Sequence, residues 1–370
     1  MLDPTNSILK LKVPIFVLFL FSLFVNYKPQ IKYIDFFVLM FAVFVVSMCF
    51  GVFSGGAMDY QFTMQYATFF LLLICVLWDS YIDLFTPLVV SSVFVSIITI
   101  IGFISMISFP ALESGLYLFS TSFDYTFLMS KRTFMGVEFT SFFYKSIPLV
   151  VIPASFYLNE IINNNKASLK NILLVFLFLF SLFCAGNRAM IGVVFLIAFF
   201  ISYDRISKWP FIKPLLFIVF VAAVYIGYLS ITEKGEESND IKFGHIESYI
   251  DYFKNSWYML LFGSGAGSTF FSKGFESMTG ITEWTYLELI RLYGIVGFVI
   301  FVMFLLYPLR DYNAKLRNIY GWKAFSLGYV FYLFICASNP YLTSSTGFLC
   351  ILLIYSICSN PRYRINKDFV

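Results

Sequence analysis

Residues 172–203 read ILLVFLFLFSLFCAGNRAMIGVVFLIAFFISY, and Arg188 is the only charged residue among them. Two apolar runs, 172–187 and 189–203, flank the pair Asn187-Arg188. Each run is slightly shorter than the roughly 20 apolar residues that cross a bilayer as a helix. Because a charged side chain is costly in hydrocarbon and must reach an interface, the pattern predicts a tight hairpin of two membrane helices with the arginine at its tip.

The whole chain shares this apolar character. Of its 370 residues, 60% are hydrophobic and only 12% are charged, and its mean hydropathy is +0.83. Soluble domains carry roughly 25% charged residues, because they must cover their surface with polar groups. A chain dissolved in lipid can instead turn Phe and Leu outward. The composition therefore excludes a soluble globular protein and favours an integral membrane protein.

Apolar runs of membrane length recur along the chain. We predict an all-α, polytopic membrane protein that forms a single domain over residues 1–370, with about 11 (10–12) transmembrane helices. Lys10 and Lys12 precede the first run as in a secretory signal, but no small-x-small cleavage site follows, so the first span is expected to be retained. The predicted spans cover residues 8–27, 34–53, 62–78, 84–109, 142–162, 172–187, 189–203, 214–232, 288–309, 322–338 and 346–358.

Lysines and arginines are concentrated in four of the connecting segments, 163–171, 204–213, 310–323 and 359–370. Short loops rich in these residues face the cytoplasm, so the alternate segments are expected outside. Two of these, 110–141 and 233–287, are far longer than the 2–8 residues of ordinary bundle connections. We expect them to form two large periplasmic loops that carry the function. The side on which the N-terminus lies stays open.

Several classes of site have no support in the sequence. The charges show no basic run, so nucleic-acid binding is not expected. The six cysteines lie in or beside apolar stretches, where a thiol acts as a small hydrophobic group. His245 is the only histidine, so a histidine metal site would need carboxylate or thiolate help. We expect neither a metal nor a cofactor.

The second long loop and the start of the span that follows it hold three groups of candidate residues. The glycine-rich stretch 263–268 could present the backbone N–H groups of Gly265 and Gly267 to a phosphate, although a purely structural turn is the stronger interpretation. Glu288 and Arg291 stand at i and i+3, where they can neutralise each other on a helix. Glu283 has no such local partner, which makes it a candidate general base, or else a solvated acid.

Cations and aromatic residues supply the other candidates. Arg188 suits a phosphate, since a guanidinium binds one through two hydrogen bonds, although it could also reach lipid headgroups. Arg132, beside Lys131, is a second candidate anion ligand in the first long loop. The aromatic rings in the second loop could stack on sugars or anchor at the membrane interface: Tyr249, Trp257 and Trp284.

Several of these features together resemble the bacterial O-antigen polymerase (Wzy-type), of the O-antigen polymerase and ligase family. They are the short hairpin tipped by Gly186-Asn187-Arg188, the external loop with its glycine-rich turn, and Gly294-x-x-Gly297 at the start of a span. Members of the family often carry His followed by Asn, Ser or Gln, then nine variable residues, then Gly-x-x-Gly. This chain has Glu283 and Trp284 at those two places and keeps both glycines.

The resemblance implies a glycosyltransferase on the periplasmic face of the bacterial inner membrane. It would join undecaprenyl diphosphate-linked oligosaccharide repeat units into polysaccharide for lipopolysaccharide O-antigen biosynthesis. Arg188, assisted by Arg132 and His245, would hold the diphosphate, and Glu283 would take the proton of the acceptor hydroxyl. A polysaccharide chain-length regulator is the implied partner, besides membrane lipids. The alternatives are an O-antigen ligase that transfers glycan to lipid A core, a polysaccharide flippase or transporter, and a structural component of an assembly complex.

Overall fold

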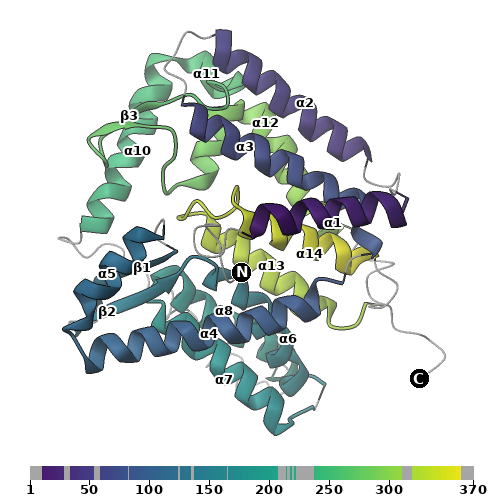
Figure 1. Ribbon diagram of the computed structural model, residues 1–370, viewed down its shortest axis with the longest axis vertical. Helices are drawn as coiled ribbons and strands as arrows, with labels where there is room; N and C mark the ends of the chain where they lie inside the picture. Colours follow the sequence, from purple (N-terminus) through teal and green to yellow (C-terminus); the bar gives the residue numbers. More distant parts are fainter. Residues whose placement is uncertain are drawn as a thin grey trace. The chain divides into compact units, whose positions relative to one another are not determined.

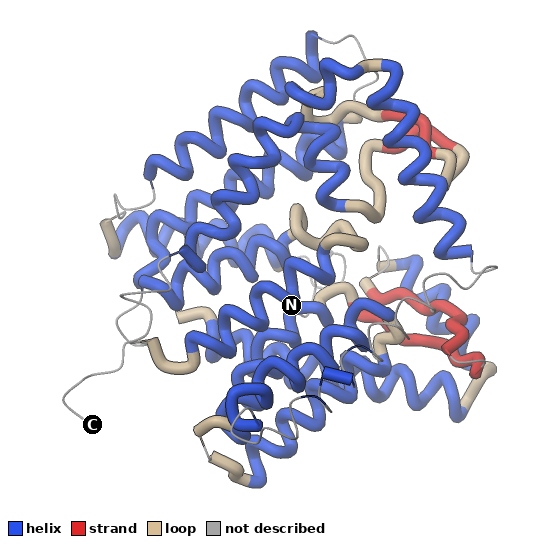
Figure 2. Tube along the Cα trace, turned by 180° about the vertical axis from the view of Figure 1, so that it is seen from behind, coloured by secondary structure: helices blue, strands red, loops and turns tan. Residues whose placement is uncertain are grey.

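The computed structural model describes residues 11–28, 34–53, 59–81, 83–123, 126–134, 137–164, 166–206, 214, 217–218, 221, 237–310 and 319–359. These residues are mostly helical and include two short β-hairpins (Figures 1 and 2), which the all-α expectation did not contain. The predicted span 214–232 lies almost entirely outside the described residues, as does much of the predicted cytoplasmic segments 204–213, 310–323 and 359–370.

The predicted single domain consists of two compact units, each built from segments that are distant in sequence. Unit 1 comprises residues 1–22, 83–232 and 320–335, and unit 2 comprises residues 23–82, 233–319 and 336–370. The first helix, α1 (Lys12–Asn26), contributes residues to both.

Unit 1 holds the predicted arginine-tipped hairpin. Its elements are α4 (Phe85–Ser108), α5 (Leu112–Ser122), β1 (Phe127–Phe134), β2 (Val137–Tyr144), η3 (Ile147–Val150), α6 (Val151–Ile162), α7 (Leu169–Cys184), α8 (Arg188–Ile206) and α13 (Trp322–Cys336). Helices α7 and α8 pack against each other and each also packs on α6. The turn between α7 and α8 ends at Asn187, whose side-chain oxygen accepts the N–H of Ala189. The predicted helical hairpin with Arg188 at its tip is therefore confirmed.

Helix α4 shows an inside-out distribution of polarity. Its buried face carries Ser92, Ser96 and Thr99, whereas its exposed face carries large apolar residues such as Phe94 and Ile101. The hydroxyl of Ser181 in α7 donates to that of Ser96 at 2.9 Å. Small and hydroxylated residues between helices, with bulky apolar residues outside, are typical of helices packed in lipid. The packing of α4 therefore supports the membrane class independently of the composition.

The predicted span 142–162 is corrected in its first part. Residues up to Tyr144 belong to β2, which pairs antiparallel with β1 in a register that joins Phe127 to Tyr144. A 3₁₀ turn with Pro148 near its start follows, and the α-helix begins only at Val151. Proline lacks an N–H and is tolerated at the start of a helix but not within it, so it marks the place where the helix can begin.

Unit 2 contains the second long loop of the sequence prediction. Its elements are α2 (Ile34–Phe53), α3 (Tyr60–Leu72), η2 (Leu73–Tyr81), α10 (Glu237–Asn255), α11 (Trp257–Phe262), β3 (Phe270–Ser272), β4 (Ser277–Thr279), α12 (Thr285–Arg310) and α14 (Ser345–Ser359). Helix α14 is buried along nearly its whole length and packs on η2. Helix α12 packs on α2 and on α11.

Three helices of the described residues, α2, α4 and α12, are both long and apolar enough to cross a bilayer. Several shorter apolar helices accompany them, including α7, α8, α13 and α14. The membrane class is thus supported, whereas the count of 11 spans stays a prediction.

Candidate functional site

The second long loop is folded rather than extended, and α10 is its main element. The buried residues His245, Ser248 and Tyr249 stand at i, i+3 and i+4, so α10 presents one continuous face to the rest of the segment. From there the chain continues through α11, the glycine-rich turn and the hairpin β3–β4 to the start of α12 (Figure 1). Residues 237–291 are the candidate site region.

A buried ion pair holds this region together. Arg291 and Glu288 of α12 are 2.5 Å apart between Nη2 and Oε1, and their side chains are 0% and 3% exposed. Nε of Arg291 donates to the second carboxylate oxygen at 3.1 Å. Nη1 donates to the hydroxyls of Ser264 and Ser268, and Nη2 also donates to the carbonyl of Gly280. All five N–H donors of the guanidinium are therefore used inside the protein, and the predicted i, i+3 pair is confirmed.

Tyr249 extends the network from α12 to α10. Its hydroxyl donates to Oε2 of Glu288 at 2.6 Å and lies 2.6 Å from the hydroxyl of Thr282. Burial, and next the charge of Glu288, raise the pKa of Tyr249 well above its usual range, so the phenol keeps its proton. Because the only proton of the Tyr249 hydroxyl is used in the hydrogen bond to Glu288, the hydroxyl of Thr282 must be the donor in its bond to Tyr249. The chain of bonds fixes residues 249, 282, 288 and 291 against one another.

The glycine-rich turn packs on a break in α12. Gly294 has φ +66° inside the helix, so the carbonyls of Arg291 and Leu292 turn away from the usual helical acceptor pattern. The N–H groups of Ser264 and Gly265 donate to these two carbonyls at 2.7 Å and 3.1 Å. Gly265 itself has φ +95°, and a Cβ there would lie 2.1 Å from the backbone nitrogen of Gly51.

These contacts favour the structural interpretation of the turn over the phosphate site. The N–H of Gly265 is already donated to Leu292, so it is not free for a phosphate in this conformation. Gly267 contributes its carbonyl, which accepts the N–H of Asp59 at 2.9 Å. The turn acts as a structural clamp between α2, α3 and α12.

His245 fastens the hairpin β3–β4 to α10. Its Nδ1 lies 2.7 Å from the hydroxyl of Ser272, and its ring meets Phe275 edge-on. Burial, and next the nearby charge of Lys242, lower the pKa of His245, which favours the neutral ring. Among the described residues, its Nε2 has no hydrogen-bond partner. Lys273 adds an exposed ion pair to Asp251 of α10 at 2.7 Å.

Glu283 lies at the accessible edge of the network, immediately before α12. It pairs with Lys242 of α10 at 3.5 Å, and both side chains are partly exposed. The indole N–H of the adjacent Trp284 donates to the carbonyl of the same Lys242 at 3.0 Å. Thr282 on one side is bonded to Tyr249, and Thr285 on the other donates to the carbonyl of Asn339. Glu283 is therefore a solvent-accessible carboxylate on a rigid support.

Lys242 is the residue of this arrangement that sequence reasoning missed. It lies 41 positions before Glu283, in a stretch taken for a loop. The signal that could have found α10 is the helical spacing of Ile241, His245 and Tyr249.

The other predicted ligands lie elsewhere. Arg188 opens α8, and Arg132 lies on β1 opposite Phe139, both in unit 1; their side chains are outside the described part of the structure. Beside β1, an open hollow of about 630 Å³ is lined by Pro110, Ala111, Glu113, Ser114, Tyr117, Leu118 and Lys131.

Of the three aromatic residues predicted to stack on sugars, only two are accessible. The ring of Tyr249 is buried against Phe270, so neither face is open to a ligand in this conformation. Trp284 is partly exposed beside Glu283, and Trp257 is 70% exposed on α11.

Within the described residues, no group of three or more His, Cys, Asp or Glu side chains is arranged to hold a metal ion. Comparison of the chain with models of known protein families, with curated proteins and with solved structures gives no match.

Proposed function

We propose that this chain is a membrane glycosyltransferase of the O-antigen polymerase type, which extends a glycan carried on undecaprenyl diphosphate. The observation that carries the proposal is the placement of Glu283: an accessible carboxylate, held on both sides by hydrogen-bonded threonines at the entry to an apolar helix of membrane length. A general base for a lipid-linked substrate needs both access and a fixed position near the membrane surface.

The proposed reaction needs one proton acceptor and one leaving-group stabiliser. The hydroxyl oxygen of the acceptor sugar attacks the anomeric carbon of the donor, and the bond from that carbon to the diphosphate oxygen breaks. Glu283 takes the hydroxyl proton. The leaving undecaprenyl diphosphate departs as an anion, which cationic donors stabilise without having to protonate it. In this proposal, Trp284 contacts a sugar ring beside the reacting hydroxyl.

The diphosphate role is proposed for Arg188, with Arg132 assisting, as the resemblance implies. Arg291 is unsuited to this role because all five of its donors are occupied. The arginines of unit 1 and Glu283 of unit 2 are therefore tested by separate variants.

The test is polymerisation by the purified protein in detergent. The probe is the undecaprenyl diphosphate-linked repeat unit from the source strain, without nucleotide, and the products are separated on gels. Wild-type protein is expected to produce a ladder of lipid-linked glycans. Glu283→Gln is expected to slow the reaction by about 10²- to 10⁴-fold, the contribution of a general base. Arg188→Ala is expected to abolish the ladder.

The matched control is Glu247→Gln, which removes another exposed carboxylate that also lies 3.5 Å from a lysine, Lys273. It is expected to polymerise at the wild-type rate. Full activity of Glu283→Gln would overturn the base assignment. A folded protein that makes no ladder would overturn the polymerase, and transfer after addition of lipid A core would then indicate a ligase.

A further inference from the structure

The short helix α11 exposes almost nothing but large apolar side chains. Trp257, Tyr258, Leu261 and Phe262 are all exposed, Trp257 at 70% and Phe262 at 57%. Such a surface on a loop outside the membrane would be unfavourable in water, at about 25 cal/mol per Å² of apolar area.

This surface continues directly onto α12. A Cβ at Gly294 would lie 2.1 Å from the carbonyl oxygen of Leu261 and 2.6 Å from the carbonyl carbon of Phe262, so the end of α11 touches the break in α12. Directly after Gly294, Ile295 and Val296 of α12 are exposed, and Val299 is exposed about one turn further along. The apolar surface of α11 and that of a membrane-length helix thus form one continuous patch.

The position of the break along α12 sets the depth of α11. Sixteen residues separate Gly294 from Arg310 at the charged end of α12, a rise of about 24 Å at 1.5 Å per residue. The hydrocarbon core is about 30 Å thick. If Arg310 lies at one surface of the hydrocarbon core, Gly294 lies inside the core, about 6 Å below its opposite surface.

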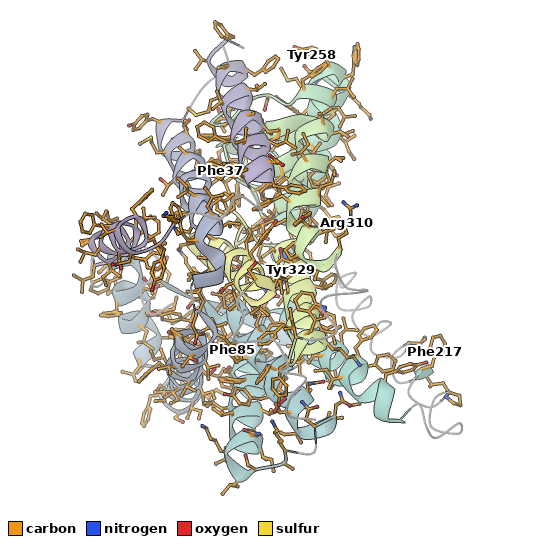
Figure 3. All side chains as sticks on the ribbon, turned by 90° about the vertical axis from the view of Figure 1, so that its right-hand side faces the viewer. Phe37, Phe85, Phe217, Tyr258, Arg310 and Tyr329 are labelled. Carbon is orange, nitrogen blue, oxygen red and sulfur yellow. The ribbon has the colours of Figure 1, made fainter. Side chains whose placement is uncertain are left out.

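Helix α2 gives the same depth independently. Asp35 lies at one end of α2, and Gly51, sixteen residues later, would place a Cβ 2.8 Å from the carbonyl oxygen of Ala266 in the glycine-rich turn. Phe36 and Tyr307 are in ring contact at 4.3 Å, so the charged ends of α2 and α12 lie side by side. Figure 3 shows Phe37 and Arg310 toward one end of these helices and Tyr258 at the opposite end.

We infer that α11 inserts into the bilayer at the boundary between headgroups and acyl chains, with lipid as its binding partner. Trp and Tyr are enriched at this depth because their rings are apolar and their N–H or O–H groups reach water. Trp257 therefore contacts lipid rather than sugar, and the second long loop is re-entrant over residues 257–268. The inference depends on α2 and α12 spanning the membrane and not on the proposed glycosyl transfer.

Depth-dependent quenching of tryptophan fluorescence tests this placement. Full-length protein is reconstituted in phosphatidylcholine vesicles brominated at acyl positions 6,7 or 11,12, and aqueous iodide is the third quencher. The signal of Trp257 is the difference between wild type and Trp257→Phe. Trp284→Phe is the matched control, since Trp284 lies on the polar edge beside Glu283 and Lys242.

The difference signal of Trp257 is expected to lose more intensity to the 6,7-bromolipid than to the 11,12-bromolipid, and little to iodide. The difference signal of Trp284 is expected to show the reverse preference, for iodide. Iodide quenching of Trp257 without bromolipid quenching would overturn the inference, and so would stronger quenching by the deeper bromines. If Trp257→Phe does not fold, Tyr258→Trp in the wild-type background supplies an added probe on the same exposed surface.

Discussion

The buried pair of Glu288 and Arg291 leads to a quantitative prediction about the second long loop. Arg291→Met keeps the bulk and apolar stem of the side chain but removes the charge and five donors. Glu288 is then left buried with Tyr249 as its remaining partner, and the carbonyl of Gly280 loses the guanidinium. Removing one member of a buried pair costs about 3–5 kcal/mol.

We expect this loss of stability to appear as easier local opening of residues 245–288, because the hydrogen bonds of Glu288 and Arg291 hold this segment in place. Since every 1.4 kcal/mol is a tenfold change, the equilibrium for local opening should rise by about 140- to 4,000-fold. Amide hydrogen exchange in the detergent-solubilised protein measures this opening. The amides of α4, in unit 1, serve as the internal reference.

Two further variants test whether the effect comes from the buried ion pair itself. Lys273→Met breaks an exposed ion pair, which solvent screens, and should leave the opening nearly unchanged. The double variant Glu288→Leu with Arg291→Met removes both charges and should recover part of the loss. The reasoning is refuted if Arg291→Met increases exchange no more than Lys273→Met does.

Three other variants give simpler expectations. Folding lowers the pKa of His245, so the locally opened state binds the proton more readily than the folded state. The stability of residues 245–288 against opening should therefore fall as pH decreases below about 6.5. Amide exchange measured from pH 7 to pH 5 should show this pH dependence in the wild type and should show less of it in His245→Gln. Gly265→Ala adds a Cβ against Gly51 at a residue with positive φ. We expect the folded state to lose stability by about 1–3 kcal/mol or more from backbone strain, which a reduced yield of folded protein would show. Gly115→Ala adds a Cβ that meets no described atom within 4 Å, so it should instead stabilise α5 by about 0.5–1 kcal/mol.

The membrane helices were predictable because their signal is local. Long runs of apolar residues and the single charge at Arg188 sufficed for the hairpin of α7 and α8. The hairpin β1–β2 was missed because Phe142, Phe143 and Tyr144 extend the apolar run of the following helix. Hydropathy alone does not distinguish a buried strand from the start of a span.

The candidate site was predictable only where its contacts are close in sequence. Glu288 and Arg291 are three residues apart, and their pairing follows from helical geometry. The partners of Glu283 and Tyr249 come from another element, and their pairing depends on how α10 folds back onto α12. The sequence favoured a structural turn over a phosphate nest for the glycines, but it did not reveal the carbonyls of α12 that accept the N–H groups of the turn.

The break in α12 has a consequence for the order in which this protein is assembled. A glycine accepts ordinary helical angles as well as positive φ, so α12 can enter the bilayer as one unbroken helix that satisfies its own backbone. The interrupted form needs replacement donors for the carbonyls of Arg291 and Leu292, and Ser47 of α2 supplies one of them, 245 residues away in the chain. We therefore expect α12 to insert before it breaks. The break then forms in a late folding step, when α2 and the glycine-rich turn pack against α12.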